Sequence, residues 1–132
     1  MKIESDKVLV ENTNDKLFTY LSDFNNFSQL MPAQVTNWKS TADECSFTIN
    51  GLATVGMKII NKVPNEVINI VSGDKTPFKF TLNIHLKPQD GGAKTEGQLL
   101  FESDLNPMMK MMVEKPLTNF FNMLAQKMKD IK

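Results

Sequence analysis

The chain has 132 residues, 41% hydrophobic and 23% charged, which suits one domain with its own core over residues 1–132. Fifteen lysines balance fifteen acidic residues, and arginine, the usual bidentate reader of phosphates and guanine, is absent. We therefore expect no nucleic-acid partner. With the lone cysteine Cys45 and no apolar run near 20 residues, we expect a cytoplasmic protein without disulfides or a membrane span.

The N-terminal third predicts one strand and two short helices. Residues 2–11 carry Val8, Leu9 and Val10 and read as a strand, and the polar residues 12–14 can cap a helix. The pattern predicts a short helix up to about residue 24. A second short helix follows and ends at Pro32.

The middle of the chain predicts four strands, over residues 34–39, 44–50, 53–63 and 66–72. In the third of these, Met57 and Ile59 share a two-residue phase, and Asn61 continues it. We therefore expect Asn61 either to place an amide in an apolar interior or to lie in water at the end of the strand.

The clearest alternation covers residues 78–86. Phe80, Leu82 and Ile84 point one way and polar residues point the other, which predicts a strand with one dry face. A turn at residues 90–92 leads to a returning strand over residues 93–104, where Leu99 and Phe101 match the dry face.

The last segment predicts a long helix over residues 107–131. Apolar residues recur every three or four positions and include Met109, Leu117 and Phe120. Pro116 lies inside this helix, where it removes a backbone hydrogen bond, so we expect a kink between Met112 and Pro116.

The predicted fold is α+β. Strands joined by short turns pair antiparallel, and the long helix is the only element with enough apolar surface to cover the dry face. This order, and the segment Leu-Ser-Asp-Phe-Asn-Asn-Phe-Ser-Gln-Leu-Met-Pro at residues 21–32, resemble the START-like superfamily. The resemblance implies a helix-grip fold with a curved sheet of about seven strands around the C-terminal helix. It also implies a cavity for a lipid, quinone, polyketide or plant hormone.

Combining the resemblance with the strand and helix phases predicts ten residues that line this cavity, with Asn61 as a possible polar anchor. The ten are Met57, Ile59, Phe80, Leu82, Ile84, Leu99, Phe101, Met109, Met112 and Phe120.

Catalytic and metal sites are not evident in the sequence. His85 falls on the polar side of its strand, and Cys45 reads as a small half-buried residue without a histidine to activate it. The carboxylates form no acid–base pair, and no set of three or four ligands suits zinc. We expect no catalytic residue, metal or cofactor.

Methionines crowd the start of the long helix at positions 108, 109, 111 and 112. Methionine adapts to varied apolar ligands, but it also serves as core filler. Four such residues cannot share one helical face, so we expect at least one to be exposed or to meet the short helices. A cavity mouth or a homodimer contact would explain this.

Three functions remain open at this point. The first is binding, transport or sensing of a hydrophobic small molecule. A fully packed interior would argue against this function. The second is a cyclase or dehydratase, which needs ionisable groups inside the cavity. The third is a packed domain that acts through a protein partner or a homodimer.

Overall fold

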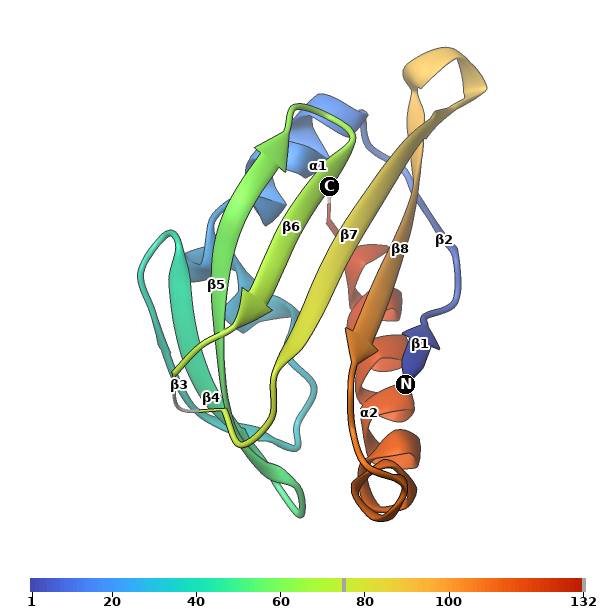
Figure 1. Ribbon diagram of the computed structural model, residues 1–132. Coiled ribbons are helices and arrows are strands. Elements are labelled where there is room, and N and C mark those ends of the chain that lie inside the picture. Colours follow the sequence, from blue (N-terminus) through green and yellow to red (C-terminus); the bar gives the residue numbers. More distant parts are fainter. Residues whose placement is uncertain (75, 132) are drawn as a thin grey trace.

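The computed structural model describes residues 1–74 and 76–131, so Lys132, the last residue of the expected domain, lies outside the described residues. Strands dominate the chain, and one long helix closes it (Figure 1). In chain order the elements are β1 (Lys2–Glu4), β2 (Val8–Val10), α1 (Asn14–Leu21), η1 (Phe24–Leu30), β3 (Val35–Ser40), β4 (Glu44–Ile49), β5 (Ala53–Val63), β6 (Val67–Ser72), β7 (Phe80–Gln89), η2 (Asp90–Gly92), β8 (Lys94–Ser103) and α2 (Pro107–Met128).

All strands belong to one antiparallel sheet in the order β1-β8-β7-β6-β5-β4-β3, with β2 also paired to β8. The sheet has eight strands, one more than expected, because the first predicted strand is interrupted at Ser5. There the Ser5 hydroxyl accepts a hydrogen bond from the Leu99 backbone N–H at 2.9 Å, taking the place of a backbone acceptor.

The alternation in the seventh strand is confirmed. Phe80, Leu82, Ile84 and Leu86 are buried, whereas the residues between them are exposed or half-buried. The pairing of β7 with β8 is regular and continuous from Phe80↔Ser103 to Gln89↔Lys94. This long hairpin supplies much of the apolar face on which the rest of the molecule packs.

The long helix α2 lies against this apolar face (Figure 1). Its buried side is formed by Val113, Leu117, Phe120, Phe121, Leu124, Ala125 and Met128. The Asn106 side chain caps the helix by accepting a hydrogen bond from the Met109 N–H at 2.9 Å. The helix is a single element through Pro116 and ends at Met128, three residues before the predicted end.

The two short helical segments pack against different parts of the fold, α1 against β6, β7 and β8 and η1 against β3 and α2. α1 buries Leu17 and Leu21, and the second predicted helix is the 3₁₀ segment η1. Within η1, the rings of Phe24 and Phe27 meet edge to face with centroids 5.1 Å apart. The aromatic residues of the 21–32 segment therefore serve the core.

Candidate functional site

A small apolar void lies between the sheet and the middle of α2. Its volume is about 20 Å³, close to the space of a single water molecule. We call this void and the side chains around it the slot. The slot is lined by Phe47, Ile49, Val55, Met57, Phe78, Phe80, Phe101, Leu117, Phe120 and Phe121.

Packed aromatic rings fill the space where an open cavity was expected. The ring of Phe47 stacks on that of Phe120 with centroids 5.9 Å apart and planes inclined by 22°. The ring centroid of Phe101 lies 5.2 Å from that of Phe80 and 5.1 Å from that of Phe121. The interior is therefore nearly filled, and the ready-made cavity that the resemblance implies is not open in this structure.

Four of the ten residues predicted to line the cavity lie around the slot: Met57, Phe80, Phe101 and Phe120. Their role toward a ligand stays a prediction. Four others belong to the packed sheet face away from the slot. Of these, Leu82, Ile84 and Leu99 are fully buried and Ile59 is half-buried.

The two predicted helix residues lie outside the slot. Met112 is 65% exposed, and Met109 is half-buried. Met112 precedes Val113 by one position and so lies about 100° from it around the helix, away from the sheet. Met109 does follow the buried stripe, but the first turns of α2 lie past the end of β8, so little covers them (Figure 1).

Asn61 is exposed on the outer face of the sheet and does not line the slot, in keeping with the alternative that it lies in water. The cause is an irregularity in the pairing of β5 with β6 between Ile59 and Asn61, which makes Ile60 an extra residue. The two-residue phase therefore reverses after Ile59. The Asn61 amide donates to Asn69 at 3.2 Å, and the Asn69 amide donates to Asn83 at 2.6 Å.

Six lining residues were absent from the predicted set: Phe47, Ile49, Val55, Phe78, Leu117 and Phe121. A signal existed for five of them, because they follow the dry phase of their strands or the helical stripe. Phe121 is adjacent to the stripe residue Phe120 and widens the buried face of α2.

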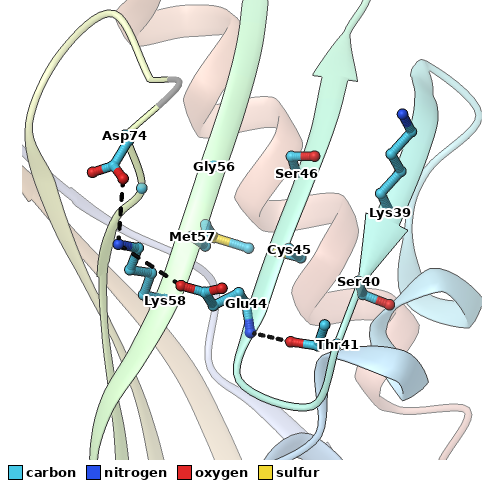
Figure 2. A pocket seen from close by; sticks show the side chains of 11 residues that line it. Lys39, Ser40, Thr41, Glu44, Cys45, Ser46, Gly56, Met57, Lys58 and Asp74 are labelled. Atoms are coloured by element: carbon cyan, nitrogen blue, oxygen red, sulfur yellow. Dashed lines mark hydrogen bonds and ion pairs between the residues drawn. The ribbon is translucent and has the colours of Figure 1, made fainter.

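A second hollow of about 340 Å³ lies on the other side of the sheet from α2, over β3, β4 and β5 (Figure 2). It is a shallow surface groove with charged walls. Lys58 forms ion pairs there with Glu44 at 3.7 Å and with Asp74 at 3.6 Å. Burial raises the pKa of the neighbouring Cys45 thiol to about 12, so this thiol is a poor nucleophile at neutral pH.

The remaining chemistry-bearing residues are dispersed. His85 is exposed on the outer face of β7, as predicted. Within residues 1–74 and 76–131, no group of three or more His, Cys, Asp or Glu side chains is placed to hold a metal ion. Over the same residues, no helix is long and apolar enough to cross a membrane.

No protein-family model matches the chain, and no curated protein matches its sequence. Solved structures do match it. The norcoclaurine synthase from Thalictrum flavum aligns with a TM-score of 0.75 and 14% identity, covering 98% of this chain and 84% of that one.

This chain has the helix-grip fold. The di-domain ARO/CYC BexL from the BE-7585A biosynthetic pathway also aligns with a TM-score of 0.75 and 14% identity, over 98% of this chain and 45% of that one. A conserved protein from Geobacillus kaustophilus aligns with a TM-score of 0.71 and 10% identity, covering 98% of this chain and 93% of that one. The helix-grip fold expected from the START-like resemblance is thus confirmed.

Proposed function

We propose that this helix-grip protein binds a small apolar molecule in the slot, which widens to admit it. One observation carries the proposal. The slot is lined by apolar side chains alone, and it lies under Leu117 and Phe120, just past the least anchored part of α2.

The first turns of α2 are weakly held. The first buried residue of the helix is Val113, and Met108, Met111 and Met112 project into solvent. Pro116 has no N–H to donate to the preceding turn, so the two halves of the helix are joined by fewer hydrogen bonds. The first half of α2 can therefore move away from the sheet at a small cost in buried surface.

A ligand needs more room than the closed slot offers. Small-molecule pockets typically measure roughly 300 Å³ or more, against about 20 Å³ here. The side chains best placed to yield are Phe120, on α2, and Phe78, which precedes β7 and is only half-buried. Outward movement of these two rings would enlarge the slot.

The chemistry of the lining supports binding over catalysis. No lining residue carries an ionisable group, so a bound molecule would meet no acid or base within the slot. Two structural neighbours are named as a synthase and an ARO/CYC, which shows that the helix-grip fold can host enzymes acting on organic molecules. A cyclase or dehydratase activity in this chain would need catalytic groups from outside the slot.

The proposal can be tested with the neutral fluorescent probe N-phenyl-1-naphthylamine. We expect saturable binding at one site per chain, tighter in Phe120→Ala, where the slot is wider, and lost in Val55→Phe, where it is filled. Ile60→Ala is the matched control, because Ile60 is exposed on β5 away from the slot.

Two results would overturn the proposal. One is that neither the wild-type protein nor Phe120→Ala binds the probe although both are folded by far-UV circular dichroism. The other is that Val55→Phe binds the probe as the wild type does. If Phe120→Ala unfolds, the milder Phe120→Leu replaces it.

A further inference from the structure

The first half of α2 is apolar on two opposite sides. Val113 and Leu117 are buried against the sheet, whereas Met108, Met111 and Met112 are 73%, 85% and 65% exposed. At about 100° per residue, these three methionines lie within roughly one third of the helix circumference, opposite the buried stripe. We call Met108, Met111 and Met112 the methionine face. A helix that is apolar on two sides is normally covered on both.

One charged residue of α2, Lys115, shares the methionine face. Lys115 lies on the same side of the helix one turn later, followed by the uncharged Asn119. The nearest carboxylate along the helix, Glu114, points to the flank, where it forms an ion pair with Lys110 at 3.8 Å. The exposed side of this half-helix therefore combines apolar side chains with a positive charge.

Size argues against a second copy of this chain as the covering partner. Three methionine side chains at these exposures present on the order of 400 Å² of surface, about half of what each partner buries in a stable interface. The same features match an interfacial helix, which inserts apolar side chains among lipids and is attracted to anionic headgroups.

A second segment, at the same end of the molecule, carries no charged residue. The turn between β4 and β5 lies at the same end as the start of α2 (Figure 1). From Cys45 to Met57 the chain contains no charged residue, and Leu52, in this turn, is half-buried. This turn therefore adds no charged side chain that would have to be desolvated at a bilayer.

We propose that the methionine face docks this protein on the surface of an anionic lipid bilayer. The three methionines enter the boundary between headgroups and acyl chains, and Lys115 remains among the lipid phosphates. This orientation turns the start of α2 toward the bilayer. Passage of an apolar ligand between the bilayer and the slot rests on the proposed function, whereas the docking does not.

The test is co-sedimentation of the full chain with phosphatidylcholine vesicles, with and without phosphatidylglycerol. We expect binding to the anionic vesicles that falls with added salt. In Met111→Asp, we expect the partition coefficient to fall by at least about tenfold. Ile60→Asp is the matched control and keeps wild-type binding, because Ile60 is 63% exposed on β5.

A second pair of variants tests the charge. Lys115→Glu should weaken binding to anionic vesicles, whereas Lys87→Glu, on the exposed side of β7, should not. Far-UV circular dichroism checks that each variant is folded. Probe binding in the slot is measured on the same variants, so a failure of docking and a failure of the ligand site are seen separately.

Three outcomes would overturn the docking proposal. The wild-type protein could fail to sediment with anionic vesicles, or Met111→Asp could sediment as the wild type does. Sedimentation velocity could instead reveal a dimer that Met111→Asp dissociates, and the covering partner would then be a second copy of the chain.

Discussion

The indole of Trp38 stacks on the ring of Phe47, with centroids 5.3 Å apart and planes inclined by 25°. Phe47 in turn lines the slot and stacks on Phe120 of α2. The only tryptophan of the chain is therefore one ring away from the proposed ligand site. Any molecule that separates Phe47 from Phe120 changes the surroundings of this indole.

This stack predicts an optical signal for ligand binding. Titration with the naphthylamine probe should change the emission of Trp38 with the same midpoint as the probe's own fluorescence. Phe47→Leu should reduce the tryptophan response. An unchanged tryptophan spectrum at probe saturation would place the bound probe elsewhere.

The two sides of α2 should differ sharply in their effect on stability. Phe120→Ala removes a buried ring and should lower the free energy of unfolding by about 3–5 kcal/mol. Met111→Ala removes a side chain that is 85% exposed and should change it by less than about 0.5 kcal/mol. Urea denaturation measures both, and equal losses would contradict this description of α2.

The Asn106 cap should control the mobility of the helix start. Asn106→Ala leaves the Met109 N–H without its acceptor, so we expect a loss of about 1 kcal/mol in stability. Hydrogen exchange should accelerate at the amides from Met109 to Val113, with little change beyond Leu117. Uniform acceleration along α2 would show instead that the helix opens as one unit.

The buried thiol of Cys45 should make stability depend on pH at the alkaline end. Burial raises its pKa from 9.0 to about 12 in the folded chain, so below pH 9 the thiol is protonated in both states and its contribution is fully present. Between pH 9 and 12 the unfolded chain loses this proton and the folded chain keeps it, so the free energy of unfolding falls. Cys45→Ala should show a shallower decline in urea denaturation over this range, and equal slopes would contradict the assignment.

Two glycines should respond differently to an added methyl group. A Cβ at Gly73 would lie 3.0 Å from the Gly56 carbonyl carbon, which is backbone and cannot easily move. A Cβ at Gly97 would lie 2.8 Å from the terminal methyl of Met128, which can rotate away. We expect Gly73→Ala to cost about 1–3 kcal/mol and Gly97→Ala less, as measured by thermal and urea denaturation.

Much of the architecture follows from local periodicity. The alternation through Phe80, Leu82 and Ile84 and the stripe from Val113 to Met128 were readable because strand and helix place side chains at periods of 2 and 3.6 residues. A dry strand face and a long apolar helix must cover each other, whatever else the chain does. The helix-grip arrangement could therefore be predicted from the sequence.

The site required the tertiary structure. An extra residue at Ile60 turned Asn61 outward, and the overhang of α2 beyond β8 left Met109 only half-buried. Neither event has a local signature, because each depends on how one element lies against its neighbours. The sequence by itself determined which side chains are apolar and which face of each element they share. Only the packed structure decided that the rings of Phe47, Phe101 and Phe120 close the slot to about 20 Å³, since a void's volume depends on the spacing between elements distant in the chain.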